Sequence, residues 1–328
     1  MNFLFFIVFI NIIIFFFRNR INKFINIYDT PDKKRKFHKS AVPLSGGLIF
    51  FVNLIFISLY FHFFFNNYLV NEVFFQSNEG LIAFFFGSTA LFLLGVIDDK
   101  YKLAASIRLF LTFFVTYLVV MIDNDLIIKN IHSNFFDKTF QLSNLSILFT
   151  ILCFSLFINA MNMFDGINCQ CILYTIIHFL IFYYYSSLDI FLFFLISALF
   201  LLYSNFKNYL FLGDSGVYLL GFIISFFYIK FYQVNYIKNV EIIFLYMLIP
   251  GLDMIRLFIL RLYNKKNPFD GDLNHLHHIL LKKYDYNLTF ITSALLVAAP
   301  IILSFFIAKT FILIIISVMV YFFLILRK

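Results

Sequence analysis

LSILFTILCFSLFINAMNMFDGINCQCILYTIIHFLIFYYYSS, residues 145–187, decides the fold of this chain. Two apolar runs, at about 145–161 and 172–187, stand on either side of a patch with three Asn and one Asp. Apolar runs approaching ~20 residues have the length that a helix needs to cross the hydrocarbon of a bilayer. Amides and carboxylates cost free energy in hydrocarbon, and membrane proteins that keep them usually use them. The stretch therefore predicts two membrane-spanning helices joined by a polar, functional turn at the membrane surface.

The composition of the whole chain extends this prediction. Of the 328 residues, 62% are hydrophobic and only 13% are charged, whereas soluble domains carry roughly a quarter charged residues. We therefore expect an all-α polytopic membrane protein with about 11 transmembrane helices, in a single integral-membrane domain over residues 1–328. The first span lacks the basic start and the small-residue cleavage site of a signal peptide, so we expect it to stay in the protein. The expected spans are approximately 2–17, 46–65, 80–97, 106–123, 145–161, 172–187, 190–204, 215–231, 241–261, 288–307 and 310–326.

The positions of the basic residues predict the orientation in the membrane. Lys and Arg concentrate on the cytoplasmic side of membrane proteins. Of the 25 Lys and Arg, 20 lie in alternate loops and at the C-terminus, and five lie on the other side. This distribution predicts a periplasmic N-terminus and a cytoplasmic C-terminus, and it gives no support for binding of nucleic acid. Among the outer loops, residues 124–144 are predicted to form a small hairpin.

Five polar islands lie on the side predicted to be cytoplasmic, and we expect them to converge on one site. They cover residues 29–47, 95–108, 159–168, 211–216 and 264–278. The first island contains a basic cluster between Asp29 and His38, which also fits a role in setting membrane topology. Its Gly46-Gly47 pair, which opens the next span, is suited to close helix packing.

The second and third islands supply carboxylates and amides. Asp98 and Asp99 are adjacent at a membrane edge, where two like charges usually imply a cation or a proton-transfer role; the alternative is a solvated helix end. Asn159, Asn162 and Asp165 recur every three residues and share a face if the segment is helical. The alternative for these side chains is hydrogen bonding between helices.

The fourth and fifth islands supply another carboxylate and three imidazoles. Asp214 lies between two Gly at the start of a span, where a helix N-terminus favours anions and where an ordinary helix cap would look similar. His275, His277 and His278 can bind zinc, transfer protons or donate to phosphate. No Cys or acidic partner stands at zinc spacing, so phosphate contact is favoured. We expect His275 and His278 to share one face of a helix, with His277 off to the side.

Taken in order, the islands resemble the polyprenyl-phosphate N-acetylhexosamine-1-phosphate transferases, glycosyltransferase family 4. The motifs that carry the resemblance are Asp-x-Pro-Asp with a following Arg-Lys-x-His, Pro-x-x-Gly-Gly, Asp-Asp, Asn-x-x-Asn-x-x-Asp-Gly, Phe-Leu-Gly-Asp-Ser-Gly and His-x-His-His. The family includes the enzymes that start enterobacterial common antigen, the O-antigen of lipopolysaccharide and wall teichoic acid, and the phospho-MurNAc-pentapeptide translocase. The His-x-His-His form is more similar to the branch that transfers N-acetylglucosamine (GlcNAc).

The resemblance implies transfer of a sugar 1-phosphate from a UDP-N-acetylhexosamine to undecaprenyl phosphate, with release of UMP and with Mg²⁺ as cofactor, Mn²⁺ being the alternative ion. Asn162 and Asp214 would hold the metal. Asp98 and Asp99 would position or deprotonate the lipid phosphate, and Asp165 would lie near the nucleotide. The expected catalytic residues are thus Asp98, Asp99 and Asp165, and the expected substrate-binding residues are Arg108, Asn159, Asn168, His275, His277 and His278.

The sequence departs from the family pattern at two places. Bacterial relatives usually repeat Asp-Gly where this chain has Asn168-Cys169, so Asn168 can contact uracil but cannot act as an acid or base. Many relatives have Asp-Arg before the histidines, and here Leu273 follows Asp272. A phosphate contact is then absent or comes from Lys265 or Lys266.

Two alternative functions stay open at this point. Within the family, the alternative is phospho-MurNAc-pentapeptide transfer in peptidoglycan synthesis. From another class, an ion-coupled transporter would use membrane carboxylates as relays, but it predicts internal repeats and acids at mid-bilayer, and the chain shows neither. We expect a multi-pass protein of the bacterial inner membrane, embedded in the bilayer with its active site facing the cytoplasm, and we leave a homodimer open.

Overall fold

The computed structural model describes residues 2–31, 40–64, 78–268 and 272–327. These residues are mainly helical, as the composition predicted. The helices are α1 (Asn2–Ile25), α2 (Gly46–Phe64), α4 (Asn78–Tyr101), α5 (Ala105–Ile122), α6 (Ser146–Phe164), α7 (Gln170–Ser186), α8 (Asp189–Phe206), α9 (Gly213–Gln233), α10 (Val240–Tyr263), α11 (Leu276–Lys283), α12 (Tyr286–Ser304) and α13 (Thr310–Leu326), with short 3₁₀ turns η1 (Asn124–Leu126) and η2 (Ser143–Leu145).

Each span predicted from the sequence coincides with one long helix. Within the described residues, eight helices are long and apolar enough to cross a membrane. They are α1, α4, α5, α6, α8, α9, α10 and α12. The outer helices expose large apolar side chains, such as Phe9 and Phe16 on α1 and Phe110 on α5. Such faces are unfavourable in water and suit lipid, so the chain is an all-α polytopic membrane protein.

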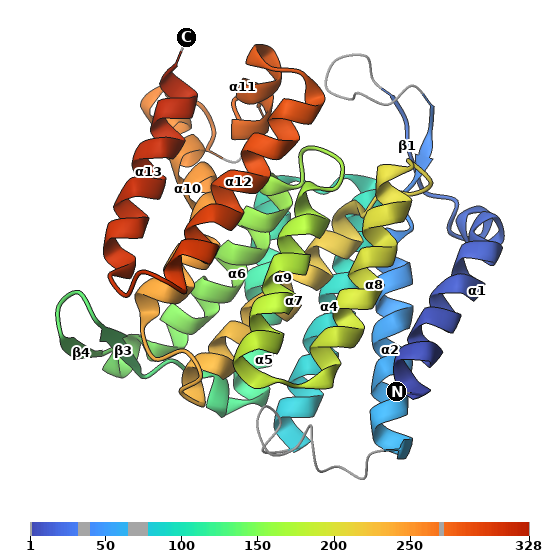
Figure 1. The fold of residues 1–328 in the computed structure, drawn as a ribbon, viewed down its shortest axis with the longest axis horizontal. Coiled ribbons are helices and arrows are strands. Elements are labelled where there is room, and N and C mark those ends of the chain that lie inside the picture. The colour runs from blue at the N-terminus through green and yellow to red at the C-terminus, as the bar shows by residue number, and fades with distance from the viewer. Residues whose placement is uncertain (1, 32–39, 65–77, 269–271, 328) are drawn as a thin grey trace.

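The helix α9 forms the centre of the bundle (Figure 1). Every residue from Ser215 to Tyr232 is buried, because α2, α4, α6 and α7 pack around this helix. Two glycines bring α2 and α4 against its N-terminal end. A Cβ on Gly95 would lie 2.3 Å from the Cα of Ser215, and one on Gly47 would lie 2.4 Å from the N of Gly216. Only glycine permits this approach, which brings the residues after Gly95 to the start of α9.

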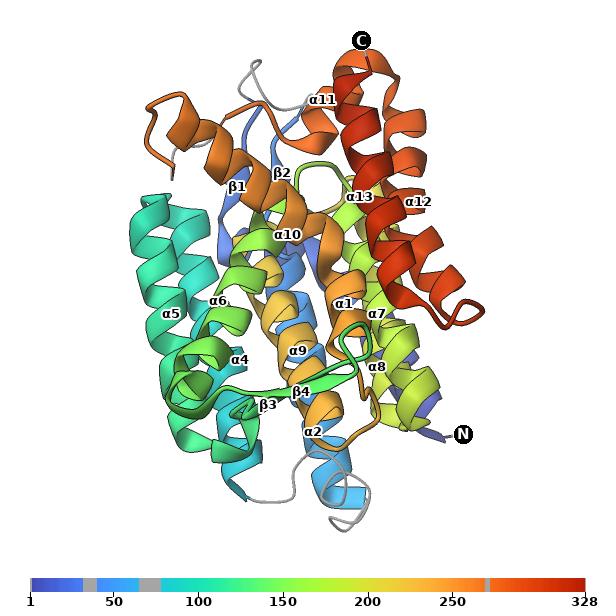
Figure 2. The same cartoon turned by 90° about the vertical axis from the view of Figure 1, so that its left-hand side faces the viewer.

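The two ends of the bundle differ in character (Figures 1 and 2). One end carries α11, the C-terminus and the strand pair β1 (Tyr28–Asp29) and β2 (Val42–Pro43). The other end carries the N-terminus and an antiparallel hairpin of β3 (Asn130–Ser133) and β4 (Lys138–Gln141). This hairpin confirms the one predicted within residues 124–144. The described residues of the five polar islands lie at the end with α11.

Candidate active site

Asp99 caps the N-terminus of α9 from the neighbouring helix α4. Its Oδ1 accepts a hydrogen bond of 2.8 Å from the backbone N–H of Asp214, and its Oδ2 accepts one of 3.1 Å from that of Ser215. The first N–H groups of a helix have no partner within the helix, and they form its positive end. Gly213 permits the contact, because it has φ +72° and a Cβ there would lie 2.8 Å from Asp99 Oδ2. Both oxygens of Asp99 therefore hold the segment that carries Asp214.

Asp98 is buried and ties three elements together. Its Oδ1 accepts from the N–H of Leu103 at 2.8 Å, and its Oδ2 accepts from the Tyr218 hydroxyl at 2.9 Å. Arg108 of α5 forms an ion pair with Oδ2 at 3.3 Å. A buried carboxylate is tolerated when it is paired and hydrogen bonded in this way. Asp98 thus holds the guanidinium of Arg108, a group with five N–H donors in a fixed geometry.

Asn162 and Asp214 meet between α6 and α9. The side-chain amide of Asn162 donates to Oδ1 of Asp214, and Arg108 Nη1 donates a long bond of 3.4 Å to Asn162 Oδ1. Asp98, Arg108, Asn162 and Asp214 therefore form one connected network, which Asp99 joins through the backbone of α9. The structure brings five of the predicted site residues together.

Asp165 follows α6 and lies near Asp99. Although solvent reaches Asp165, the surrounding protein desolvates its carboxyl. With the repulsion from the charge on Asp99, this raises the pKa of Asp165 to about 7. A carboxyl with such a pKa can both lose and take up a proton near neutral pH.

The histidine loop, residues 272–278, reaches the same region through His277. A Cβ on Gly166 would lie 1.9 Å from the imidazole of His277, so these residues are in direct contact. Burial, together with repulsion from His278 and His275, lowers the pKa of His277 to about 3. His277 is therefore neutral at physiological pH, and the contact joins the third and fifth islands.

The expectation that His275 and His278 share a helical face is wrong. The helix α11 begins at Leu276, and His275 precedes it with an extended backbone (φ −60°, ψ 153°). The reason is the side chain of His275, which bonds through Nδ1 to Asp253 Oδ2 at 3.1 Å. The ring of His277 instead lies parallel to that of His275, with ring centroids 5.4 Å apart. The ring centroids of His277 and His278 are 4.3 Å apart.

Asn159 and Asn168 lie at the margins of the network. Asn159 donates to Thr112 Oγ1 at 2.9 Å and to the Ser155 carbonyl. The bond to Thr112 joins α6 to α5, and it is the hydrogen bond between helices that the sequence offered as the alternative for this side chain. Its role in substrate binding stays a prediction. Asn168 donates to Asn208 Oδ1 at 2.7 Å, and its carbonyl accepts from Tyr286. The side chain of Asn168 thus joins the third island to the loop before α9.

The first island joins the site through its backbone. The N–H of Phe211 donates to the Pro43 carbonyl, and the N–H groups of Gly46 and Gly47 donate to the carbonyls of Phe211 and Leu212. This places the start of α2 beside the start of α9. Most of the basic cluster predicted here, residues 32–39, lies outside the described residues.

A set of buried polar residues around the site was not predicted from the sequence. Tyr218 binds Asp98, and Asp253, Arg256 and Arg261 of α10 bind the histidine loop. The signal was present, because an Asp and an Arg three residues apart inside an apolar run are costly in a membrane. These residues lie within the predicted span 241–261, and no role was assigned to them from the sequence.

The described residues contain no group of three or more His, Cys, Asp or Glu that could hold a metal ion. Asp214 and Asn162 offer one carboxylate and one amide oxygen, which is the type and number of protein ligands with which Mg²⁺ binds a phosphate substrate.

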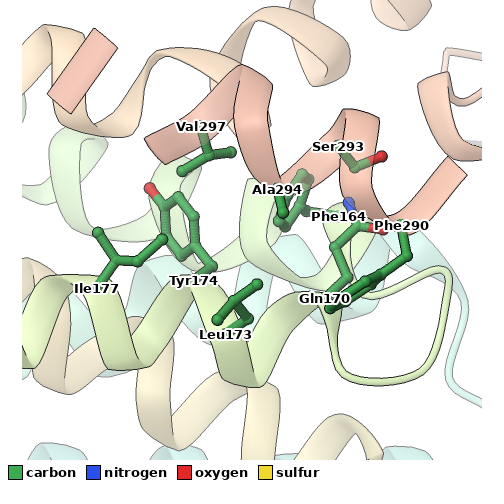
Figure 3. Close-up of a pocket in the computed structure, with 9 residues that line it drawn as sticks. All are labelled: Phe164, Gln170, Leu173, Tyr174, Ile177, Phe290, Ser293, Ala294 and Val297. Atoms are coloured by element: carbon green, nitrogen blue, oxygen red, sulfur yellow. The ribbon is translucent and has the colours of Figure 1, made fainter. Parts of the chain in front are cut away.

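Two cavities lie away from this network. The first, between α7 and α12, is lined by apolar side chains together with Gln170, Tyr174 and Ser293 (Figure 3). It has room for little more than one water molecule, so it cannot hold a nucleotide. The second is polar and lies at the opposite end of the bundle, beside β3 and the end of α9, and none of the predicted site residues line it.

The fold and the site together define a class of protein. It is a polytopic membrane protein in which carboxylates, amides and imidazoles from separate loops meet at one end of a helix bundle. Residues 81–232 match the model of glycosyl transferase family 4, a segment that includes Asp98, Asn162 and Asp214.

Curated relatives match over most of the chain. One is the undecaprenyl-phosphate alpha-N-acetylglucosaminyl 1-phosphate transferase of Escherichia coli K12, with 23% identity over 283 residues, 81% of this chain and 72% of the relative. The protein of the same name from Thermotoga maritima is 27% identical over 266 residues, 78% and 73% of the two chains. A Bacillus subtilis protein described as a probable enzyme of this kind is 25% identical over 78% of this chain and 70% of its own. These matches agree with the family that the motifs predicted: the chain is similar to glycosyl transferase family 4 over residues 81–232 and to these relatives over about four-fifths of its length.

Proposed function

We propose that this protein transfers GlcNAc 1-phosphate from UDP-GlcNAc to undecaprenyl phosphate and releases UMP. The observation that carries the proposal is the network of Asp98, Arg108, Asn162 and Asp214 at the start of α9. Relatives over about four-fifths of the chain carry the corresponding name. The reaction would be the first membrane step in the synthesis of a cell-surface polysaccharide.

The chemistry needs little more than positioning and charge neutralisation. An oxygen of the lipid phosphate attacks the phosphorus that bears the sugar, a new P–O bond forms, and the bond to the bridging oxygen breaks so that UMP leaves. One phosphoanhydride replaces another, so binding and orientation of the two phosphates supply most of the rate enhancement. Arg108 suits this task, because its guanidinium is held in place by Asp98 and presents further donors to phosphate oxygens.

Mg²⁺ would be held by Asp214 and Asn162, with Mn²⁺ as the alternative ion. When bound, it would neutralise charge on the diphosphate and polarise its oxygens. The Asp99 cap keeps Asp214 at the positive end of α9. Asp99 thus acts on the position of Asp214, which is a different role from the acid–base role expected from the resemblance.

Asp165 is the carboxyl best suited to accept a proton. The second pKa of a phosphate monoester is about 6, and the pKa of Asp165 is raised to about 7. These two values are close enough for proton transfer from the lipid phosphate to Asp165. Asp98 and Asp99 are already committed to hydrogen bonds with neighbouring groups.

The site faces the cytoplasm in this proposal. The eight helices that are long and apolar enough to cross a membrane would all cross the bacterial inner membrane, together with α2, α7 and α13. The N-terminus is then periplasmic and the C-terminus cytoplasmic. The positions of Lys and Arg support this orientation, as does the location of the N- and C-termini at opposite ends of the bundle (Figure 1).

Purified protein in detergent micelles tests the proposal. With UDP-GlcNAc, undecaprenyl phosphate and Mg²⁺, we expect UMP and a lipid-linked GlcNAc diphosphate in equal amounts. Omission of the lipid phosphate should abolish UMP release, as should Asp214→Asn. A panel of UDP-sugars, including UDP-MurNAc-pentapeptide, identifies the donor. Absence of lipid-dependent UMP release with every donor would refute the transferase proposal.

A further inference from the structure

The helix α10 presents three buried charged side chains to the histidine loop: Asp253, Arg256 and Arg261. Burial of a charge is costly unless the group is paired and hydrogen bonded. Each of the three is paired, and each also binds the loop. Arg261 donates to Asp272 Oδ2 at 2.8 Å and to the Pro268 carbonyl at 2.9 Å. The loop is therefore held by α10 at its first residue.

Asp253 holds the middle of the loop. Its carboxylate accepts from Nδ1 of His275 at 3.1 Å and from the backbone N–H of Leu276 at 3.2 Å. It also accepts from Arg256 Nη2 at 2.8 Å and from the Tyr321 hydroxyl at 2.6 Å. A carboxylate offers about four acceptor positions, so Asp253 is saturated. Because Leu276 is the first residue of α11, Asp253 also caps that helix.

The last helix, α13, takes part through Tyr321, which is fully buried. The Tyr321 hydroxyl donates to Asp253 and accepts from Arg256 Nε at 2.7 Å. Arg256 Nη2 in turn donates to the Asn274 carbonyl at 2.6 Å. At the far end of α11, Lys283 donates to the Leu324 and Ile325 carbonyls of α13. The helix α13 therefore binds the last turn of α11 directly, and it supports the start of α11 through Asp253.

The hydrogen bond to Asp253 decides how His275 can meet a ligand. An imidazole that donates from Nδ1 to a carboxylate presents its Nε2 on the other side of the ring. The ring of His277 stacks on His275 and contacts Gly166, so a shift of His275 would disturb the third island as well. Asp253 thus fixes both the place and the hydrogen-bonding state of His275.

We propose that Asp253, Arg256 and Tyr321 are positioning residues, which fix the histidine loop and select the ring nitrogen that His275 presents to the substrate. The helix α13 then contributes to the site through the Tyr321 hydroxyl. The structural half of the proposal, that these residues fix the histidine loop, does not depend on the proposed transferase function. The catalytic half, that they act on the reaction through His275, rests on that function.

Hydrogen exchange measured by mass spectrometry tests the structural half without any activity. Tyr321→Phe keeps the ring and removes only the hydroxyl, so the fold should survive. We expect amides of residues 274–283 to exchange at least tenfold faster in Tyr321→Phe than in the wild type. The matched control is Tyr246→Phe, which removes another buried hydroxyl, bonded to Ser304 at 3.1 Å, and should leave these amides unchanged. Equal exchange in the wild type and Tyr321→Phe would overturn the proposal.

A double-mutant cycle tests the catalytic half. Asp253→Asn should lower kcat for UMP release about tenfold, because an amide cannot accept from every donor now bound. In a His275→Ala background the same change should have little further effect. An equal loss in both backgrounds would show that Asp253 supports only the fold, and would overturn its action through His275. If the wild type releases no UMP, the transferase function fails, while the exchange result still decides the positioning role.

Discussion

Replacement of Gly95 by Ala is expected to separate α4 from α9 and to disable the site. A Cβ on Gly95 would lie 2.3 Å from the Cα and 2.5 Å from the N of Ser215. Carbon atoms in contact lie about 3.5–4.0 Å apart, so the two helices must move apart by roughly 1.2 Å or more. Both atoms that Cβ would meet belong to backbone, so no side-chain rotation relieves the overlap.

The consequence for the site follows from the Asp99 cap, which is one helical turn beyond Gly95. The bonds from Asp214 N and Ser215 N to Asp99 are 2.8 and 3.1 Å long. The same separation would lengthen them to about 4 Å, beyond hydrogen-bonding distance. A displacement of this size at a catalytic site costs about a hundredfold in rate, and overpacking costs about 1–3 kcal/mol of stability.

The assay is UMP release in detergent, together with thermal unfolding of the same samples. We expect Gly95→Ala to lose about two orders of magnitude in kcat/KM and to unfold at a lower temperature. Gly251→Ala in α10 is the matched control, because a Cβ there meets nothing within 4 Å. Ala also has a helix propensity better by about 1 kcal/mol, so this variant should be as stable and active as the wild type. A fully active and stable Gly95→Ala protein would refute the close packing on which the site depends.

Three further predictions follow from the site. Asp99→Asn should lower kcat/KM at least tenfold and destabilise the protein by about 1–2 kcal/mol. The reason is that an amide can accept from only one of the two N–H groups at the α9 terminus. UMP release measures the first effect and thermal unfolding measures the second. Asp165→Asn should stabilise the protein increasingly between pH 4 and pH 7. Desolvation of the carboxyl by the surrounding protein and the charge of Asp99 raise the pKa of Asp165 from 3.8 to about 7, so ionising it costs stability as pH rises through this window. Unfolding temperatures of both proteins that run parallel from pH 4 to 8 would contradict this. Chelation of divalent cations should stop UMP release, and Mg²⁺ should restore it, whereas activity that survives chelation would contradict the metal role of Asn162 and Asp214.

The spans and the polar islands could be predicted because the chain is so apolar. Against this background, a few carboxylates, amides and imidazoles identify the loops that carry function. The period of three in Asn159, Asn162 and Asp165 predicted one shared face, yet Asn159 binds Thr112 and only Asn162 binds Asp214. Spacing along one helix cannot tell which neighbour each residue of a face will meet.

The role of Asp99 could not be predicted for a related reason. A carboxylate beside another carboxylate suggests a cation site, and the cap of a helix 115 residues further along the chain leaves no local signal. Tyr321 is one of 20 tyrosines, and nothing near it in the sequence distinguishes it from a lipid-facing aromatic residue. Its function depends on Asp253 and Arg256, which only the packing of α13 on α10 brings close.

The charges of the network bear on how two anionic substrates can bind here. Asp98, Asp99, Asp165 and Asp214 lie in or beside the network, and Arg108 is the cation that the structure pairs with Asp98. The α9 N-terminus offsets Asp99, and a pKa of about 7 leaves Asp165 partly neutral. In the described part of the chain, the side-chain partner of Asp214 is the neutral amide of Asn162, and the ion pair of Arg108 is made with Asp98. A nucleotide diphosphate and a lipid phosphate would add several negative charges at this point, and a divalent cation would offset them at short range. The arrangement of the acidic residues thus supports the proposed divalent cation on grounds other than the family resemblance.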